Sequence, residues 1–373
     1  MNKKRELKIL ISGQDSGGMG GSEKFLIDLA NELKAKNNEV EFTTVHNSKF
    51  NQVLTESGYH PLTIPTRMDI LGWWKGLIKF IVYLPAVLVQ NYVLLSKYKK
   101  GRETKIIIPG FSDKIILSPL AKLLGYRVIW IEYAPLKPVF TRNFGIPKTL
   151  YRFSLRYADK IVCPTKNTYR SLLSEKIFDR KKLGIIPVGI KIVDVNFRKV
   201  NKSRIVVGMV SRIEEGKGQD TLIEATRILK DRISNLEVQI IGEGDNKFLI
   251  NLISKYKLQK VIKLVGYKKD IYKEMMKFDV CVFPTRWPLE GFGLVCLEAM
   301  MFKIPLVASN FGPVPEVVGD GAVMVNPEPY ALARGIMKVI NNPKLAQSLV
   351  KKGLARVKRY FDIVEIAAEY EKI

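Results

Sequence analysis

Two pairs of charged residues in the second half of the chain have spacings that suit an anionic ligand rich in hydroxyl groups. Arg212 and Lys217 are five residues apart, and their guanidinium and ammonium groups could converge on a diphosphate and neutralise its charge. Glu290 and Glu298 are separated by seven residues, and each carboxylate can accept hydrogen bonds from two hydroxyls. Each pair taken alone is also compatible with charges on a solvated loop or helix.

The segment between the two glutamates predicts a helix end that binds phosphate. Glycines follow Glu290 at two of the next three positions, and an apolar helical pattern begins there and continues past Glu298. Backbone N–H groups at the start of a helix lie at its positive end, where they bind phosphate oxygens. The candidate residues of this turn are Gly291, Phe292, Gly293 and Leu294.

A second glycine-rich turn, GGMGGSE, lies at residues 17–23. Glycines there would let the backbone approach a ligand closely, and the helix that follows offers unpaired N–H groups. Gly20 and Gly21 are the candidate ligand-binding positions, although such a turn also occurs for purely structural reasons. Because the spacing differs from GxGxxG and no acidic residue ends the second strand, the sequence gives little support to NAD binding.

The motifs fall between strand and helix patterns that alternate along both halves of the chain, which predicts a parallel, doubly wound sheet in each. In the first half we expect strands at 8–12, 39–45, 104–109, 127–132 and 160–163, and helices at 23–36, 118–124 and 149–157. In the second half we expect strands at 205–209, 237–241, 262–265, 280–283 and 305–308, and helices at 220–230, 247–257, 270–276 and 293–301. A polar, basic stretch at 188–203 predicts the linker between two domains.

Residues 71–98 contain an apolar segment that stands apart from both series. The run from Phe80 to Ser96 has 17 residues without a charge, whereas a full membrane span needs roughly 20 apolar residues. Trp73 and Trp74 beside lysines are typical of the boundary between water and lipid. Three interpretations stay open: a helix that faces the core, an interfacial helix and a transmembrane helix.

The net charge of +25 lies mostly in the first half, where residues 1–200 contain 34 Lys and Arg against 16 Asp and Glu. Such a field attracts any polyanion, but the chain has no nucleic-acid recognition motif, so we expect no nucleic-acid partner. Its three cysteines are far apart, which favours a reducing compartment. The segment MNKKRELKILISG predicts a strand instead of a signal peptide.

The ordered set of motifs resembles glycosyltransferase family 4 (GT4), whose members have the two-domain GT-B fold. The resemblance rests on GGSE at 20–23, on Arg212 with Lys217, on Glu290 with Glu298, and on PLVASNFGPVPEVVGDGAVMVNP at 305–327. It implies an α/β protein of two Rossmann-like domains whose parallel sheets face an interdomain cleft. The domains would be an acceptor-binding domain at 1–190, a nucleotide-sugar-binding domain at 204–350, and a C-terminal helix at 351–373 that crosses back to the first domain.

The resemblance also implies roles for the candidate residues. Arg212 and Lys217 would neutralise the donor diphosphate, with the backbone at Gly21 and at 292–294 completing its binding site. Glu298 would hold the ribose hydroxyls and Glu290 would face the transferred sugar. The turn formed by Gly266 and Tyr267 would lie near the nucleobase.

The family's chemistry implies retention of anomeric configuration through an oxocarbenium-like transition state, with cationic side chains in place of a metal ion. Neither a metal nor a cofactor is therefore expected. The chain departs from the family pattern at Glu132, where many relatives have a histidine. Glu132 could accept the proton of the acceptor, orient a sugar hydroxyl, or have a structural role.

The activity implied by the resemblance is that of a retaining glycosyltransferase of the hexosyltransferase type. Its partners would be a nucleotide-diphosphate-sugar donor and a lipid-linked or growing glycan acceptor, in surface polysaccharide synthesis. The basic first half and residues 71–98 imply a cytoplasmic protein in peripheral contact with an anionic membrane. A non-catalytic sugar-nucleotide-binding protein and a GT-B sugar-nucleotide epimerase are the alternatives.

Overall fold

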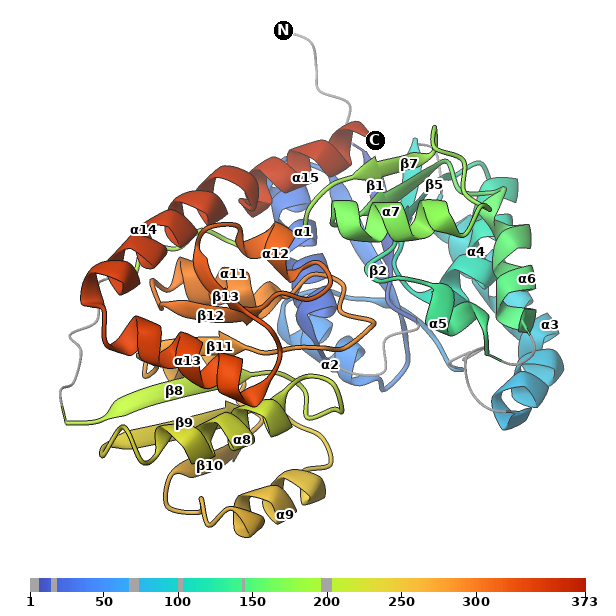
Figure 1. Cartoon of the computed structure of the whole chain (residues 1–373). Coiled ribbons are helices and arrows are strands. Elements are labelled where there is room, and N and C mark those ends of the chain that lie inside the picture. Colours follow the sequence, from blue (N-terminus) through green and yellow to red (C-terminus); the bar gives the residue numbers. More distant parts are fainter. Residues whose placement is uncertain (1–6, 15–18, 67–73, 100–102, 143–144, 196–202) are drawn as a thin grey trace, which may run out of the picture. The chain divides into compact units, whose positions relative to one another are not determined.

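The chain folds into two compact units, each built around its own parallel sheet (Figure 1). The computed structural model describes residues 7–14, 19–66, 74–99, 103–142, 145–195 and 203–373. Unit 1 comprises Met1–Lys191 and Ile363–Ile373, and unit 2 comprises Ile192–Asp362. The division between the units lies within the linker region expected at 188–203. Gly17, Gly18 and Trp73 of the predicted motifs lie outside the described residues.

The sheet of unit 1 has seven parallel strands in the order β3-β2-β1-β4-β5-β6-β7. Most of its strands are short runs of Val, Ile and Leu, as buried parallel strands require. The predicted strands are present, and the structure adds β3 and β7, whose three residues are too few to give a periodic signal. The strands are β1 (Lys8–Ser12), β2 (Glu39–Val45), β3 (Leu62–Ile64), β4 (Thr104–Ile108), β5 (Arg127–Ile131), β6 (Lys160–Cys163) and β7 (Leu183–Ile185).

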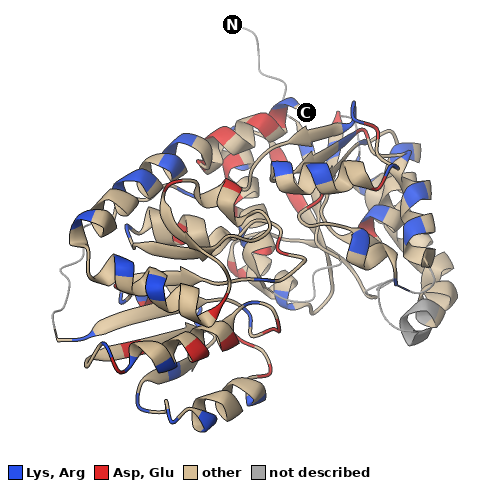
Figure 2. Cartoon of the chain, in the orientation of Figure 1, with Lys and Arg blue, Asp and Glu red and all other residues tan. Residues whose placement is uncertain are grey.

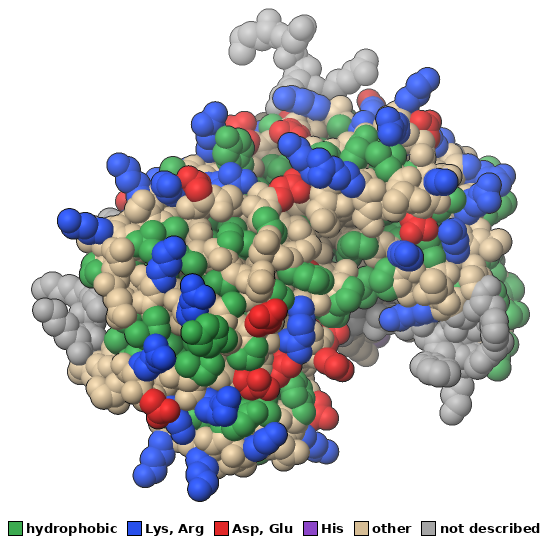
Figure 3. Space-filling model, in the orientation of Figure 1, with side chains coloured by type: hydrophobic (Ala, Val, Ile, Leu, Met, Phe, Trp, Pro, Cys, Tyr) green, Lys and Arg blue, Asp and Glu red, His purple; other side chains and the backbone are tan. Residues whose placement is uncertain are grey.

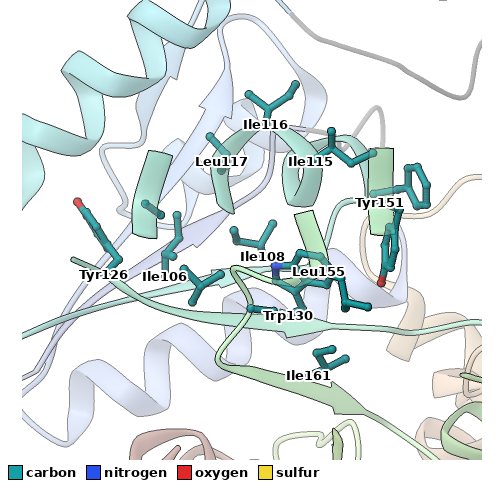
Figure 4. Packing of buried hydrophobic residues seen from close by; sticks show 14 of the residues in the cluster. Ile106, Ile108, Ile115, Ile116, Leu117, Tyr126, Trp130, Tyr151, Leu155 and Ile161 are labelled. Carbon is teal, nitrogen blue, oxygen red and sulfur yellow. The ribbon is translucent and has the colours of Figure 1, made fainter. Parts of the chain in front are cut away.

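Helices of unit 1 form two groups, in which α4 packs against α3 and α6 while α1 packs against α15. The cluster between α4 and the sheet includes Ile115 and Leu117 from the helix and Ile106 and Trp130 from the strands (Figure 4). The helices are α1 (Gly21–Ala35), α2 (Lys49–Glu56), α3 (Trp74–Tyr98), α4 (Phe111–Leu123), α5 (Lys137–Phe140), α6 (Ile146–Leu155), α7 (Lys166–Ser174) and α15 (Ile363–Lys372).

Helix α4 begins seven residues earlier than the sequence predicted, at Phe111 instead of 118. Its first turn contains Asp113 and Lys114, which are polar in sequence but buried in the structure. Hydrophobic periodicity could not include them because their burial depends on partners elsewhere in the chain. Asp113 accepts hydrogen bonds from the Ser12 hydroxyl and the Gln14 backbone N–H, and thereby anchors the start of the glycine-rich turn after β1.

The sheet of unit 2 has six parallel strands in the order β10-β9-β8-β11-β12-β13. They are β8 (Ile205–Val210), β9 (Leu236–Ile241), β10 (Ile262–Gly266), β11 (Val280–Phe283), β12 (Leu306–Ser309) and β13 (Ala322–Val325). The helices are α8 (Gln219–Leu229), α9 (Lys247–Lys255), α10 (Ile271–Met275), α11 (Leu294–Met301), α12 (Val314–Val318), α13 (Pro329–Ile340) and α14 (Pro343–Tyr360). Helix α8 packs against α13 and α11 packs against α14, so helices again form two groups.

The end of the chain is divided between the two units. A helix from 351 was expected to cross back to the first domain, but α14 belongs to unit 2 and only the segment from Ile363 belongs to unit 1. The Ile363 backbone N–H donates to the Ile190 carbonyl at 3.1 Å. On α15, Tyr370 is buried and lies with its ring centroid 6.2 Å from that of Phe25 on α1, which fixes this helix on unit 1.

Helix α3 has a buried stripe and a broad exposed apolar face. Phe80, Val87, Asn91 and Leu95 are buried against the unit 1 core. By length and composition, Phe80–Tyr98 could cross a membrane, but helices of soluble cores meet the same criteria. Most of the large apolar residues exposed on α3 recur at the three- and four-residue spacing of a single helix face: Ile78, Ile81, Val82, Val89, Tyr92 and Val93. The helix therefore faces the core on one side and presents an apolar surface on the other.

Candidate active site

The predicted charged motifs of unit 2 lie in two loops that leave neighbouring strands. Strand β8 pairs with β9 on one side and with β11 on the other. The chain adds β9 and β10 on one side of β8 and then adds β11, β12 and β13 on its other side, so the switch point of the sheet lies between β8 and β11. In open parallel sheets, ligands bind outside the carboxyl ends of the strands at such a switch point. The loop after β8 contains Arg212 and Lys217, and the loop after β11 contains Glu290.

The two loops are held together by backbone and side-chain hydrogen bonds. The Arg286 backbone N–H donates to the Gly216 carbonyl at 2.8 Å. The Arg286 guanidinium forms a bidentate ion pair with Asp220 in the first turn of α8 and also donates to the Thr221 hydroxyl. Burial raises the pKa of Asp220, but the hydrogen bonds from Arg286 and the backbone outweigh it, so the net pKa is lowered. These contacts fix the position of Lys217 relative to Glu290.

Lys217 and Glu290 form a largely buried ion pair. The distance between Lys217 Nζ and Glu290 Oε2 is 3.0 Å, and both side chains are 10% exposed. The Thr285 hydroxyl donates to the same carboxylate oxygen at 3.3 Å. Because Lys217 carries three N–H donors and the carboxylate receives one, the ammonium retains donors for a further anion. The structure therefore brings together two residues that the sequence predicted separately.

Burial lowers the pKa of Lys217, while the charge and hydrogen bond of Glu290 act in the opposite direction. We therefore expect Lys217 to lose its proton at a lower pH than an exposed lysine does. Binding of an anion should be strongest below this lowered pKa and should weaken as the pH rises through it. The check is the affinity for inorganic pyrophosphate, measured by calorimetry from neutral to alkaline pH.

The variant Lys217→Arg provides the control for this pH dependence, because a guanidinium stays protonated throughout the range. Its affinity should change less with pH than that of the unmodified protein. Equal loss of affinity in both proteins would assign the titration to another group.

Arg212 lies at the same edge of the sheet but in a more open position. Its side chain is 58% exposed, and its guanidinium is 3.4 Å from the Glu214 carboxylate. The Gln219 amide donates to the Arg212 carbonyl at 2.7 Å and to the Ser211 hydroxyl at 2.8 Å, so the backbone of Arg212 is held more firmly than its side chain. To turn toward a ligand, the guanidinium would exchange its contact with Glu214 for one with that ligand.

Trp287, which the sequence interpretation did not include, lies beside both cations. The Lys217 Nζ is 3.7 Å from the centre of the Trp287 ring, and the Arg212 Cζ is 5.6 Å from it. Both distances are within the range of cation–π attraction. The sequence indicated a possible role for Trp287 only through its place in the motif loop, three positions before Glu290. Its relation to Lys217 depends on the contact between the two loops.

Glycines allow the loops after β8 and β9 to approach each other at the edge of the sheet. A Cβ on Gly242, the residue after β9, would lie 1.8 Å from the Ser211 carbonyl oxygen, so no side chain fits there. The Gly242 N–H donates to the carbonyl of Gly266, the last residue of β10, at 3.1 Å. The predicted turn formed by Gly266 and Tyr267 therefore lies near the end of β9, and Tyr267 is half exposed.

Glu290 and Glu298 both lie close to the start of α11. Gly293 is the N-cap of this helix with φ of +90°, a left-handed conformation that favours glycine, and Leu294 is its first residue. Burial raises the pKa of the Cys296 thiol, and the charges of both glutamates add to the effect. Glu298 is itself buried. Both carboxylates therefore influence the same thiol near the start of α11.

The turn from Gly291 to Leu294 is ordered by packing as well as by its glycines. The Phe292 side chain is buried, and its ring centroid lies 5.7 Å from that of Phe361 in an edge-to-face arrangement. The backbone N–H groups of this turn, and not the Phe292 ring, are what a phosphate could contact. Within the described ranges, no three His, Cys, Asp or Glu side chains come together as metal ligands would.

In unit 1, Glu132 follows β5 and lies in a buried ion pair with Lys114 of α4. The distance between Lys114 Nζ and Glu132 Oε1 is 2.6 Å, and the two side chains are 2% and 3% exposed. The Tyr151 hydroxyl donates to Glu132, and its ring packs against Trp130 at 5.0 Å between centroids (Figure 4). Lys114 also donates to the Ile131 carbonyl at 2.7 Å. This geometry favours the structural role for Glu132 over the two catalytic ones.

The other predicted residues of unit 1, Gly20 and Gly21, form the start of α1. Gly20 is the N-cap with extended backbone and Gly21 is the first helical residue, and both are exposed. Both glycines therefore lie at the N-terminal end of α1, where the sequence predicts a ligand. These two glycines belong to unit 1, whereas the charged motif residues belong to unit 2.

Comparison with known proteins finds a match to a family model in the second half of the chain. Residues 193–356 match the family model described as glycosyl transferases group 1. A glycosyltransferase of Methanocaldococcus jannaschii that is named as uncharacterized is 24% identical over 210 residues. That match covers 52% of this chain, which spans about half (51%) of the archaeal protein's length.

A longer match extends over nearly the whole chain. A Campylobacter jejuni protein is 26% identical over an alignment of 373 positions, gaps included, that covers 94% of this chain and 95% of that protein. It is named N-acetylgalactosamine-N,N'-diacetylbacillosaminyl-diphospho-undecaprenol 4-alpha-N-acetylgalactosaminyltransferase. Among solved structures, Anabaena HepE in complex with UDP and glucose has a TM-score of 0.79 at 20% identity, covering 98% of each chain. This likeness confirms the predicted fold of two Rossmann-like domains, GT-B.

Proposed function

We propose that this chain, whose second unit carries a group 1 glycosyltransferase domain, is a retaining hexosyltransferase of family GT4. It transfers a sugar from a nucleoside-diphosphate-sugar to a lipid-linked or growing glycan acceptor in surface polysaccharide synthesis. The observation that carries the proposal is the Lys217–Glu290 pair at the switch point of unit 2, with Arg212 beside it. Such a site suits a ligand with both a diphosphate and sugar hydroxyls.

In the proposed reaction, the bond between the anomeric carbon and the diphosphate oxygen breaks while the acceptor oxygen bonds to the same face of that carbon. The electron pair of the broken bond stays on the diphosphate, whose negative charge increases. Lys217 and Arg212 stabilise this charge, and the proton of the acceptor hydroxyl passes to the leaving phosphate oxygen. Because the two side chains supply positive charge, the reaction needs neither a metal ion nor a cofactor.

The remaining residues position the substrates. Glu290 holds the Lys217 ammonium and faces the transferred sugar, and Glu298 binds the ribose hydroxyls. The N–H groups at 292–294 bind the diphosphate, and the turn at Gly266 and Tyr267 lies beside the nucleobase. Unit 1 binds the acceptor. Support for a lipid-linked acceptor comes from the diphospho-undecaprenol in the name of the Campylobacter relative.

The experiment that tests the proposed function is a screen of nucleoside-diphosphate-sugars with the purified chain. Calorimetry measures binding of UDP, GDP and their sugars, and slow hydrolysis of one sugar nucleotide identifies the donor. NMR of the released sugar then reports the anomeric configuration, which should be retained in the first product. Binding without hydrolysis or transfer would favour a sugar-nucleotide-binding protein, and conversion of the donor into its epimer would favour an epimerase.

We also propose that unit 1 contacts the cytoplasmic face of an anionic membrane through the exposed apolar face of α3. Val82, Val89 and Val93 on this face are 43–65% exposed, although their side chains are large and apolar. Lys and Arg side chains lie on several helices of the same unit and project widely from the molecular surface (Figures 2 and 3). An anionic surface would attract each nearby cation by about 1 kcal/mol.

Flotation of the chain with phospholipid vesicles checks this membrane contact. At low salt, we expect the protein to float with vesicles that contain anionic lipid and to float much less with zwitterionic vesicles. The double substitution Val82→Glu and Val89→Glu should abolish flotation, because it places charges in the apolar face. Leu123→Glu is the matched control, since Leu123 is also an exposed apolar residue but lies on α4. Absence of flotation with anionic vesicles would contradict the proposal.

A further inference from the structure

We propose that Trp287 is a positioning residue of the donor site, whose indole face holds the Lys217 and Arg212 cations in the orientation that receives the diphosphate. The inference rests on the proposed function and adds a residue to which that function assigns no role. It is supported by the position of both cations over one half-buried ring: Lys217 Nζ lies 3.7 Å and Arg212 Cζ lies 5.6 Å from the centre of the Trp287 ring.

The ring is held in this position by the contact between the two loops. A Cβ on Gly216 would lie 3.3 Å from the Trp287 Cα and 3.4 Å from its Cδ1, so the tryptophan packs directly on this glycine. The Glu290 N–H donates to the Trp287 carbonyl at 3.0 Å, and the Arg286 N–H donates to the Gly216 carbonyl at 2.8 Å. These contacts fix the backbone of Trp287 and hold one edge of its ring against Gly216.

An aromatic ring solves an electrostatic problem of this site. Two cations that must converge on one diphosphate repel each other while the ligand is absent. Each cation already has a carboxylate neighbour, Glu290 for Lys217 and Glu214 for Arg212, and a carboxylate competes with the diphosphate for hydrogen bonds. The face of an indole attracts cations through its quadrupole and carries no net charge. Lys217 and Arg212 thus remain positively charged toward the ligand while the ring limits their motion.

The geometry around Lys217 also leaves one of its N–H donors for the ligand. Its ammonium donates to Glu290 Oε2 at 3.0 Å and faces the ring at 3.7 Å, which accounts for two of its three N–H directions. The third is the direction that a phosphate oxygen would occupy. Loss of the ring would let the ammonium rotate about Glu290, and the diphosphate would then meet a less ordered donor.

Two variants of similar size separate the ring's electrostatic effect from its packing. Trp287→Phe keeps an aromatic face, whereas Trp287→Leu fills part of the same space without one. We expect Trp287→Leu to weaken binding of inorganic pyrophosphate and of UDP or GDP about tenfold, and Trp287→Phe to weaken it by no more than about threefold. Both should unfold at nearly the same temperature as each other. Calorimetry measures the affinities, and thermal unfolding monitored by circular dichroism measures the stabilities.

Tryptophan fluorescence supplies a second readout that packing alone would not change. The chain has four tryptophans, and Trp130 is fully buried in unit 1. Pyrophosphate should alter the fluorescence of the unmodified protein, because it draws the cations on the Trp287 ring toward itself, and the change should disappear in Trp287→Phe. A fluorescence change that persists in Trp287→Phe, or equal weakening by Leu and Phe, would overturn the inference while the proposed function stands. If the unmodified protein binds neither pyrophosphate nor any nucleoside diphosphate, the proposed function fails and the inference fails with it.

Discussion

Replacement of Lys217 by alanine is expected to lower kcat/KM for the donor by about 1,000-fold, because it removes the cation that faces the leaving diphosphate. The ammonium acts from a largely buried position, where its charge is less screened by water than that of an exposed lysine. The measurement is steady-state transfer or donor hydrolysis with the sugar nucleotide identified by the screen. Retention of full turnover by Lys217→Ala would contradict the assigned role.

Lys217→Ala can lower activity in two ways, by removing the cation from the reaction and by destabilising the fold, because it leaves Glu290 buried without its cation. Removal of one partner from a buried pair is destabilising by about 3–5 kcal/mol. In the double variant Lys217→Ala with Glu290→Gln, the carboxylate charge is absent, so stability should recover while transfer stays abolished. Lys351→Ala, at an exposed lysine of α14, is the control with unchanged activity and stability.

Substitution of Lys114 by methionine is expected to lower the free energy of unfolding by about 3–5 kcal/mol, since it leaves the Glu132 charge buried in unit 1. The double variant Lys114→Met with Glu132→Leu removes both charges and should recover most of this loss. Urea unfolding followed by intrinsic fluorescence and circular dichroism measures the effect. The two probes also report whether the units unfold separately.

A second ion pair on the same helix provides the matched control. Lys122 of α4 pairs with Asp159, but both side chains are substantially exposed, at 43% and 31%. Lys122→Met should therefore cost less than about 1 kcal/mol. If Glu132 has a structural role, the Lys114 and Glu132 double variant keeps transfer activity within about tenfold. A stable double variant without activity would instead assign Glu132 to the reaction.

Much of the fold could be predicted because its strands are buried on both faces and are therefore continuous apolar runs. Lys8–Ser12 and Val280–Phe283 are of this kind, and their predicted bounds match the observed ones. Elements β13 and α13 of unit 2 were missed, as were the short β3 and β7 and the first turn of α4 in unit 1. Two reasons account for these misses in unit 1. Strands of three residues have no periodicity, and Asp113 and Lys114 are polar residues that only their distant partners make suitable for burial.

The sequence alone determined the alternating order of strands and helices, and with it the two-domain class of the protein. It also determined which residues can carry charge or bind hydroxyls, namely Arg212, Lys217, Glu290 and Glu298, and that glycines between the two glutamates precede a helix. These properties depend on residue type and on spacing over a few positions, which the linear chain records directly.

Only the tertiary structure decided which of these residues meet. Lys217 and Glu290 are 73 positions apart and become an ion pair because β8 and β11 are neighbours in the sheet. The same juxtaposition places Trp287 on Lys217, and the packing of α4 on β5 buries Glu132 with Lys114. Burial and long-range contacts set the electrostatics of each group, and they depend on how the strands are ordered in space, which local residue patterns do not encode.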